Sequence, residues 1–332
     1  MRIEIDGVTK RYGDVTALDD VSFAVETGET FGLVGTNGAG KTTLFKLLVG
    51  HDRPSSGRIR VGDTDVAGAG RRVRELVGFL PQIIGFPPRL TGREVLAFTA
   101  RARGVSASDR SARIAEVLET VGLTGAADRT VDGYSGGMGR RLGLAVATFA
   151  NPPVLVLDEP TAGLDPEGVA EFHRVIERIR TDSDATVIFS SHVLSEVETL
   201  CDGVAILHDG GLRAVGPVAE LTRRTSDGAI VRFHAEETEA VAPVASGFGD
   251  LELDGRVVTV TTRDDDVIDL LDAVDAVASI DSIEVRRPGL ESVFSEAIAR
   301  AADPDGGPTI GSPAGRSTDR PCTRVGSEGA RR

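Results

Sequence analysis

The sequence is poor in cysteine and in long apolar runs. Only Cys201 and Cys322 occur in 332 residues, so no disulfide framework is supported and a reducing environment is expected. The run Leu142–Ala150 is among the longest apolar stretches, far below the roughly 18 residues that a membrane-spanning helix needs. Met1–Asp6 is charged and typical of a strand, so we expect no secretion signal. Any membrane passage is therefore expected to come from another polypeptide.

Lysine is also scarce, although the chain carries 37 basic residues. Lys10, Lys41 and Lys46 are the lysines, the net charge is −14 and the pI is about 4.9. A GC-rich genome would explain the preference for arginine. A salt-rich cytoplasm would explain both features, because salt screens the surface carboxylates that keep the protein hydrated; we favour this explanation. The acidic balance and the lack of a basic stripe argue against nucleic acid as a partner.

A glycine-rich loop dominates what is present. Residues 35 to 43 read G-T-N-G-A-G-K-T-T and fit the phosphate-binding pattern G-x-x-x-x-G-K-[ST]. A buried strand is predicted at Phe31–Gly35 and a helix at Thr42–Val49, which aims the helix N-terminus at an anion. Lys41 would reach the β- and γ-phosphates, and the Thr42 hydroxyl would ligate Mg²⁺. The loop therefore predicts binding of a nucleoside triphosphate by Gly35, Thr36, Asn37, Gly38, Ala39, Gly40, Lys41, Thr42 and Thr43.

An acid pair follows a second predicted strand. Val154–Pro160 reads V-L-V-L-D-E-P, and its apolar part is typical of a central parallel strand. Open α/β sheets place ligands at the carboxyl ends of such strands. Asp158 would hold the water shell of Mg²⁺, and Glu159 would polarise an attacking water. Two solvated acids capping a strand are the alternative, which the upstream phosphate loop disfavours.

Two weaker motifs complete the pattern. Tyr134–Met138 reads Y-S-G-G-M before an apolar helical stretch, and its Ser135, Gly136 and Gly137 predict a second anion site at a helix N-terminus. A further buried strand is predicted at Thr186–Ser191, and His192 follows it. Either motif alone is more often a turn or a structural histidine. Here both occur in order with the phosphate loop.

Taken together, the motifs resemble those of the ATP-binding subunits of ABC transporters, over about residues 2–225. The resemblance implies an α/β fold: a P-loop NTPase core with a parallel sheet, an antiparallel β subdomain and a helical insert at about residues 88–150. Tyr134, Met138 and Thr36 depart from the usual residues and remove no charged or hydroxyl group from the phosphates. Signatures of the Y-S-G-G-M kind are familiar in ABC-2 type exporters. The residues that the resemblance assigns are Tyr12 for adenine stacking, Gly35–Thr42 as Walker A, Gln82 as the Q-loop glutamine, Ser135–Gly137 as the signature, Asp158 and Glu159 as Walker B, Ala162–Asp165 as the D-loop and His192 as the switch histidine.

The same resemblance implies how such a subunit works. Two copies would sandwich two ATP molecules head to tail, with Ser135 and Gly137 closing the site of the other copy and Asp165 among the nucleotide-binding residues. Thr42, Gln82 and, through water, Asp158 would hold Mg²⁺. Glu159 would act as the base and His192 would contact the γ-phosphate. Closure would drive a multi-span permease at the cytoplasmic face of the membrane, through the surface at residues 82–90.

The kind of transport stays open at this point. An ABC-2 type exporter is the favoured interpretation, and an importer is an alternative. Residues 171–201 also resemble ATPases that serve copper-site maturation of nitrous oxide reductase. A soluble mechanical ATPase of the same superfamily predicts two cassettes or a long coiled-coil insertion, and the sequence has neither.

The helical insert and the C-terminal third give further expectations. A helix is predicted at Leu90–Arg103 with Thr91 as its cap, and another at Ala107–Val121 beginning at Ser106 or Ser108. Residues 1–225 are predicted to form the ATP-binding unit and residues 228–301 a small α/β accessory domain. Its strands are expected at 229–234, 251–262 and 282–286, and its helices at 267–277 and 290–301.

The accessory segment ends in L-E-S-V-F at residues 290–294, which resembles the end of the C-terminal extension of many ABC-2 export ATPases. Dimerisation or partner docking and passive stabilisation are equally compatible with it. Residues 303–332 are rich in Pro, Gly and Ser and have little to bury, so disorder is predicted there.

Overall fold

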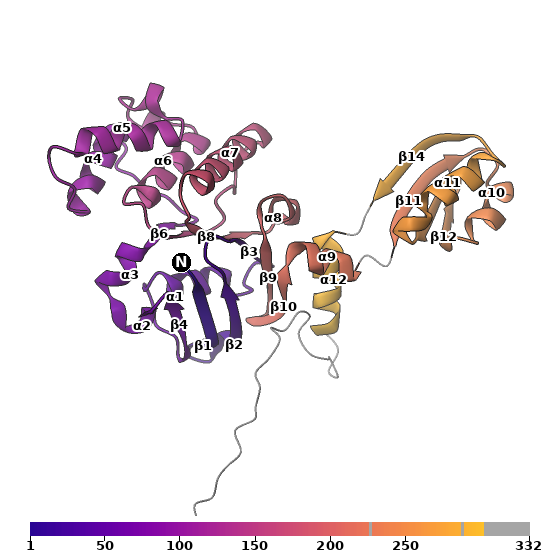
Figure 1. The fold of residues 1–332 in the computed structure, drawn as a ribbon, viewed down its shortest axis with the longest axis horizontal. Helices are drawn as coiled ribbons and strands as arrows, with labels where there is room; N and C mark the ends of the chain where they lie inside the picture. Colours follow the sequence, from indigo (N-terminus) through magenta and orange to yellow (C-terminus); the bar gives the residue numbers. More distant parts are fainter. Residues whose placement is uncertain (226–227, 287–288, 302–332) are drawn as a thin grey trace, which may run out of the picture.

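The computed structural model describes residues 1–225, 228–286 and 289–301. The predicted disordered tail at 303–332 lies outside the described residues. Three sheets organise the described chain, and Figure 1 shows helices α4 to α7 grouped on one side of the largest sheet with strands β1, β2 and β4 on the other.

The largest sheet is mostly parallel and supports the predicted site. Its order is β10-β9-β3-β8-β7-β6, in which β10 alone runs antiparallel to its neighbour. Every residue of β3, β7 and β8 is buried, as expected of strands covered on both faces. The three buried strands predicted from the sequence are therefore confirmed. The strands are β3 (Thr30–Gly35), β6 (Val77–Leu80), β7 (Val154–Leu157), β8 (Thr186–Ser191), β9 (Gly203–His208) and β10 (Gly211–Pro217).

Two hydrophobic clusters cover the faces of this sheet. In β7, Leu155 and Leu157 belong to one cluster while Val154 and Val156 belong to the other, because successive side chains of a strand point to opposite faces. The parallel strands all end at one edge, so the segments after β3, β7 and β8 meet there. These segments are the phosphate loop, the acid pair and His192.

An antiparallel sheet of order β2-β1-β4-β5 packs its apolar face against α1 (Lys41–Leu48), with Phe23 and Phe45 in one cluster. The predicted helix at 42–49 is thereby confirmed. The strands of this sheet are β1 (Ile3–Tyr12), β2 (Val15–Val25), β4 (Ser56–Val61) and β5 (Thr64–Asp65), and two short helices, α2 (Val66–Ala69) and α3 (Arg71–Leu76), lead into β6.

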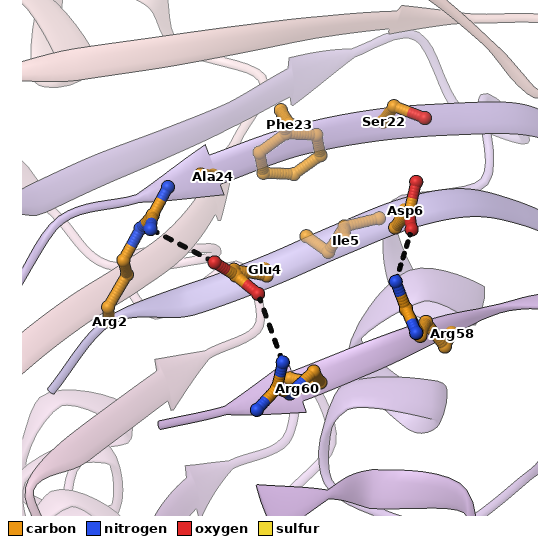
Figure 2. Close-up of a pocket in the computed structure, with 9 residues that line it drawn as sticks. All are labelled: Arg2, Glu4, Ile5, Asp6, Ser22, Phe23, Ala24, Arg58 and Arg60. Atoms are coloured by element: carbon orange, nitrogen blue, oxygen red, sulfur yellow. Dashed lines mark hydrogen bonds and ion pairs between the residues drawn. The ribbon is translucent and has the colours of Figure 1, made fainter. Parts of the chain in front are cut away.

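The outer face of the antiparallel sheet is charged. Figure 2 shows a shallow groove of about 410 Å³ there, in which Glu4 lies between Arg2 at 3.0 Å and Arg60 at 3.9 Å. Asp6 pairs with Arg58 at 3.1 Å on the same face. Exposed pairs of this kind each contribute about 0–1 kcal/mol to stability, so the apolar side of the sheet dominates its packing.

The helical insert consists of α4 (Gly92–Ala102), α5 (Arg110–Thr120) and α6 (Gly136–Thr148), and α7 (Pro166–Asp182) packs beside them. The predicted cap of α4 is confirmed: Thr91 and Glu94 form a reciprocal capping box. The predicted start of α5 was too early. Ser106 and Ser108 both hydrogen-bond to Asp109, which precedes the first helical residue, Arg110. These short side-chain bonds form a turn that competes with the helix.

The C-terminal sheet has the order β12-β13-β11-β14, with α10 (Thr238–Ala245) and α11 (Val267–Asp275) packed on it. The strand predicted at 251–262 is two antiparallel strands joined at Gly255, whose φ of +58° suits glycine. Helix α10 was not predicted, because Pro243 interrupts its pattern. The strands are β11 (Ala229–Ala235), β12 (Gly249–Asp254), β13 (Val257–Thr262) and β14 (Ile280–Arg286).

The last described helix, α12 (Leu290–Ala301), packs on the ATP-binding part. Its Leu290, Val293 and Ala297 belong to the cluster of the parallel sheet, and Figure 1 shows it against α9 (Val218–Thr225). Glu198 of α8 (Leu194–Leu200) accepts a hydrogen bond from the backbone of Leu290. The hydrophobic clusters thus separate α12 from the sheet that precedes it, and the domain division at 228–301 stays a prediction. Within the three described ranges, no helix has the length and apolarity to cross a membrane.

Candidate functional site

The phosphate loop joins β3 to α1 and depends on glycine at two positions. A Cβ on Gly35 would lie 2.4 Å from the carbonyl oxygen of Leu207. Gly40 has a φ of +104°, and a Cβ there would lie 2.6 Å from the carbonyl oxygen of Ala17. Only glycine fits such positions. Thr36, Asn37 and Gly38 are exposed at the tip of the loop, where an anion can approach the backbone.

Lys41 lies in the centre of this loop. Its ammonium group donates to the carbonyl oxygens of Gly35 at 2.7 Å and Thr36 at 3.2 Å, and its side chain is only 5% exposed. A second charge lies close by, because the Oε1 atom of Glu159 is 3.7 Å from the Lys41 nitrogen. The loop therefore holds a buried cation beside a carboxylate.

The acid pair is fixed by Ser190 at the end of the neighbouring strand. The Ser190 hydroxyl donates to Oδ1 of Asp158 at 2.8 Å and accepts from the backbone N–H of Glu159 at 2.8 Å. Asp158 is 1% exposed, and its own N–H donates to the carbonyl oxygen of Leu80 at 2.8 Å. Glu159 has a φ of +45°, which is uncommon for a residue other than glycine. Such backbone conformations persist where surrounding contacts hold them, often at functional sites.

The Glu159 carboxylate lies between the side chains of Lys41, at the start of α1, and of His192, just after β8. His192, the residue after β8, places Nδ1 3.0 Å from Oε2 of Glu159, while Lys41 approaches the other oxygen. The histidine is the accessible member, with 58% of its side chain exposed against 10% for Glu159. The structure thus brings together Lys41, Asp158, Glu159 and His192, which are far apart in the sequence.

Tyr12 is a half-exposed ring held beside α1. Its hydroxyl donates to Oδ2 of Asp52 at 2.7 Å, and Thr43 of the phosphate-loop helix also interacts with it. Lys10 lies 4.8 Å from the ring centroid and 2.7 Å from the other Asp52 oxygen. Hydrogen bonds from Lys10, from Tyr12 and from the Arg53 backbone lower the pKa of Asp52 to about 2. Burial and the contact with Asp52 raise the pKa of Tyr12.

The signature and the D-loop share a separate hollow. Ser135 begins α6 and accepts a hydrogen bond from the N–H of Met138 at 3.3 Å, while Asp165 caps α7 through Gly168 at 3.0 Å. Ser135, Gly136, Gly137 and Asp165 line a common pocket of about 380 Å³. Figure 1 shows α6 and α7 on the opposite side of the sheet from α1. This hollow is therefore a second surface, distinct from the phosphate loop.

Gln82 follows β6 and opens onto a mostly apolar groove of about 540 Å³. Arg140 of α6 lines the same groove and donates to the carbonyl oxygen of Pro81 at 3.2 Å. Burial lowers the pKa of Arg140, and the negative charges of Asp158 and Glu159 oppose that effect. Arg140 thus links the signature helix to the Q-loop by a hydrogen bond, and it interacts electrostatically with the acid pair.

Several of these residues were missed by the sequence analysis. Ser190 and the following serine end an otherwise apolar strand, and this break in the pattern was the available signal. Nothing in the sequence marked Asp52 or Arg140 as a residue of the site, because charged side chains are common just after a helix and on a helix surface.

The predicted metal ligands fit the chemistry of magnesium. Thr42, Gln82 and Asp158 offer a hydroxyl, an amide oxygen and a carboxylate, which are hard oxygen donors. Among the described residues, no cluster of three or more His, Cys, Asp or Glu side chains could hold a metal. One carboxylate is consistent with Mg²⁺, because this ion is usually bound by one or two carboxylates together with phosphate oxygens of the substrate.

Comparison with known proteins gives the family. The profile described as ABC transporter matches residues 18–162. The chain is 35% identical over 231 residues to the linearmycin resistance ATP-binding protein LnrL of Bacillus subtilis (strain 168), covering 70% of this chain and 74% of that protein. It is 37% identical over 222 residues to the bacitracin transport ATP-binding protein BcrA of Bacillus licheniformis, covering 67% and 72%. It is also 38% identical over 248 residues to the Nod factor export ATP-binding protein I of Burkholderia orbicola (strain AU 1054), covering 74% and 81%.

Solved structures agree on the fold. An ATP-binding subunit of an ABC transporter superposes with a TM-score of 0.61 at 28% identity, covering 68% of this chain and 93% of that one. A dimeric ATP-binding cassette in a post-hydrolysis state with ADP and Pi superposes with a TM-score of 0.59 at 23% identity, covering 65% and 98%. The predicted fold class is thus confirmed.

Two findings give the family: the sequence is similar over about three quarters of LnrL, and the phosphate loop, the acid pair and the histidine follow one another along the chain. This chain belongs to the ATP-binding subunits of ABC transporters, the ATPases whose ATP hydrolysis is coupled to transport.

Proposed function

We propose that this chain hydrolyses ATP with Glu159 as the base and that it energises an ABC-2 type exporter. The observation that carries the catalytic part is the position of the Glu159 carboxylate, between Lys41 at 3.7 Å and His192 at 3.0 Å. Export is supported by the name of one relative, the Nod factor export ATP-binding protein I.

Each predicted site residue has a role in this proposal. The loop amides of residues 35–43 and the Lys41 ammonium bind the phosphates, and the Tyr12 ring stacks on adenine. The Glu159 carboxylate orients the attacking water and accepts its proton, while His192 contacts the γ-phosphate. Catalysis then rests mainly on positioning and on charges fixed before the reaction.

Thr42, Gln82 and Asp158 are the proposed Mg²⁺ ligands, Asp158 through water. When bound, the ion neutralises charge on the phosphate oxygens. The protein's own contribution is to hold the Asp158 carboxylate in place, and the hydroxyl of Ser190 at 2.8 Å does so.

A second copy of the chain completes the proposed site. The hollow formed by Ser135, Gly136, Gly137 and Asp165 has a helix N-terminus and glycine backbone groups exposed to an anion. It belongs to a different surface from the phosphate loop of the same chain, so a nucleotide bound to that loop would meet this hollow in a head-to-tail dimer. The dimeric cassette among the structural relatives is consistent with this arrangement.

A membrane permease is the other proposed partner, at the cytoplasmic face of the membrane. The groove beside Gln82 runs from the Q-loop to Gly136 of the signature, so a segment bound there would contact both motifs at once. Its apolar rim includes Ile83, whose exposure is 86%. Large exposed apolar side chains are typical of interaction surfaces when they border a groove.

The partner proposal is tested by searching the neighbouring genes for a multi-span membrane protein and co-expressing it with this chain. The two proteins should co-purify, and the membrane protein should raise the ATPase rate. The variant Ile83→Ser should weaken both effects, whereas Ile268→Ser, at an isoleucine 71% exposed on α11, is the matched control. Equal behaviour of the two variants would argue against docking at this groove. A solute-binding lipoprotein in the same gene cluster would favour import over export.

We also propose that the protein works in a cytoplasm rich in salt. The net charge of −14 and the presence of only three lysines support this setting.

A further inference from the structure

A buried carboxylate near the site has no role in the mechanism above. Glu196 lies on α8, is 7% exposed and sits four residues after His192. Glutamate is almost never buried unless it is paired, because an ionised carboxylate loses its hydration there. The partners of Glu196 therefore indicate what it does.

Two hydroxyl groups donate to the same oxygen of Glu196. Thr161 donates from Oγ1 to Oε2 at 2.9 Å, and Ser191 donates from Oγ to Oε2 at 2.8 Å. Both bonds are buried. Hydrogen bonds to an ionised acceptor are stronger than neutral ones, so this carboxylate holds both hydroxyls firmly.

The two donors lie in the two segments that carry Glu159 and His192. Thr161 is two residues after Glu159, and Ser191 is directly before His192. The side chains of Glu159 and His192 meet at 3.0 Å. Glu196 bonds to a residue near each of them, so the two segments are linked at two points.

Two other buried threonines, both within helices, bond locally. Thr99 donates to the carbonyl oxygen of Val95 at 3.0 Å, and Thr148 donates to that of Leu144 at 2.9 Å, each within its own helix. Local bonds of this kind satisfy a buried hydroxyl without linking separate elements. Thr161 and Ser191 instead donate to a carboxylate on another element. Burying such a carboxylate costs more free energy than burying a hydrogen bond within one helix.

A third element approaches the free side of the carboxylate. His173 of α7 places Nε2 4.0 Å from Oε1 of Glu196, and this buried nitrogen has no hydrogen-bond partner among the described residues. A distance of 4.0 Å exceeds that of a hydrogen bond. Asp165 of the D-loop caps α7, so His173 lies on the helix that follows the D-loop.

We propose that Glu196 is a positioning residue for ATP hydrolysis. Its carboxylate holds Thr161 and Ser191 so that Glu159 and His192 keep the relative placement that the attacking water and the γ-phosphate require. This inference rests on the proposed function of Glu159 and His192 and adds a residue that acts through Thr161 and Ser191.

The test is steady-state ATP hydrolysis and ATP binding in the full chain. Glu196→Ala should lower kcat by about 10- to 100-fold, since displacing a catalytic group by about 1 Å can cost about 100-fold. The Kd for a fluorescent ATP analogue should change by less than about 2-fold, because Glu196 contacts none of residues 35–43. Glu196→Gln keeps an oxygen at the same place and should restore kcat to within a few fold of wild type.

The matched control lies two residues away on the same helix. Glu198 accepts the backbone hydrogen bond of Leu290, so Glu198→Ala should lower the melting temperature without changing kcat. Where Glu196→Ala fails to fold, Thr161→Val and Ser191→Ala each remove one donor with little change in shape. Both should reproduce the loss of kcat with an unchanged Kd.

Two results would overturn the role of Glu196. One is a normal kcat in the folded variants of Glu196, Thr161 and Ser191. The other is a parallel loss of kcat, ATP binding and stability that Glu196→Gln does not rescue, which would make the cluster structural only. Wild-type turnover and Glu159→Gln are measured alongside. If wild type fails to hydrolyse ATP or Glu159→Gln hydrolyses normally, the proposed function is overturned together with the inference built on it.

Discussion

The ammonium nitrogen of Lys41 lies 3.7 Å from the Oε1 atom of Glu159, and both side chains are almost fully buried. One residue is the predicted ligand of the phosphates and the other the predicted base, so the charge that binds substrate also stabilises the group that acts on it. A nucleotide in the loop would compete with Glu159 for Lys41. Binding would then leave the carboxylate with His192 and an approaching water as its partners.

The first prediction follows from this pairing. Glu159→Gln should reduce ATP turnover by at least about 100-fold, because general base catalysis typically contributes 10²- to 10⁴-fold. ATP affinity should be unchanged or higher, since the neutral amide no longer competes for Lys41. A nucleotide-bound dimer should accumulate, which gel filtration with ATP would detect.

The control for this variant is Glu75→Gln, at an exposed carboxylate that pairs with Arg71 on the short helix α3. It should hydrolyse ATP at the wild-type rate. A Glu159→Gln protein with wild-type turnover would refute the assignment of Glu159 as the base.

Lys41→Ala should impair ATP binding, the step before hydrolysis. The substitution removes the buried ammonium that now donates to the carbonyl oxygens of Gly35 and Thr36. A hydrogen bond to a charged group contributes about 1.5–3 kcal/mol, so the Kd for ATP should rise roughly 10- to 150-fold. Fluorescent ATP titration measures this, and an unchanged Kd would show that the nucleotide binds elsewhere. The exposed Lys46 provides the control Lys46→Ala, which should bind ATP normally.

Tyr12 tests the site of the adenine ring. Stacking of a base on an aromatic side chain is worth about 1–3 kcal/mol, so Tyr12→Ala should raise the Kd for ATP by roughly 5- to 150-fold. Tyr12→Phe keeps the ring and loses the hydroxyl contacts with Asp52 at 2.7 Å and with Thr43, so it should stay within a few fold of wild type. Equal losses in both variants would assign the effect to the hydroxyl network instead of the ring.

The partner of Tyr12 also predicts a pH effect. The pKa of Asp52 is lowered from 3.8 to about 2, chiefly by its hydrogen bond with Lys10. A lowered pKa in the folded protein means that the contribution of Asp52 to stability is fully present above a pH of about 4 and is lost as pH falls towards 2. Asp52→Asn lacks this titration. The difference in stability between wild type and the variant should therefore become smaller as the pH falls between these values. Melting temperatures of both proteins across this range measure the difference.

The sequence predicted the residues of the candidate site better than the residues that hold them in place. The buried strands, the phosphate loop and Thr91 as a cap follow from local patterns, namely apolar runs, glycines and a capping pair. Ser190 and Glu196 act through contacts with residues more than 30 positions away, and such contacts depend on the strand order of the sheet. A single sequence does not show that order directly.

The C-terminal third shows the same limit. Helix α12 has the spacing of an amphipathic helix, which correctly predicted its existence. Spacing gives the face of a helix that is buried, yet it does not give the element against which that face packs. Leu290 and Val293 pack with the parallel-sheet cluster, and the sheet nearer in sequence has its own separate core.

The acidic composition predicts that salt stabilises the protein. Repulsion between surface carboxylates acts over a Debye length of about 10 Å at 0.1 M salt and about 3 Å at 1 M. Melting temperature and ATPase rate should therefore rise from dilute buffer to molar KCl. Chloride is the salt to use, because sulfate strengthens burial of apolar surface in any protein. A melting temperature independent of KCl would favour genome composition as the cause of the arginine preference.

Removal of the C-terminal segment distinguishes the contribution of α12 from that of the sheet before it. Truncation after residue 225 takes away Leu290 and Val293, both fully buried against the ATP-binding part. Burial of such side chains is worth about 1.5–3 kcal/mol each, so the loss is about 3 kcal/mol or more. For a protein of this size, 3 kcal/mol corresponds to a fall of roughly 6–12 °C in melting temperature.

A second variant replaces residues 228–286 with a flexible Gly-Ser linker and retains α12, so its melting temperature should stay near that of wild type. Both variants should bind ATP, because every residue proposed to contact nucleotide precedes residue 225. Light scattering with ATP then measures whether dimerisation depends on the deleted sheet. If the linker variant melts as low as the truncated one, α12 does not stabilise the ATP-binding part by itself. If truncation abolishes ATP binding in a folded protein, the boundary at residue 225 is wrong.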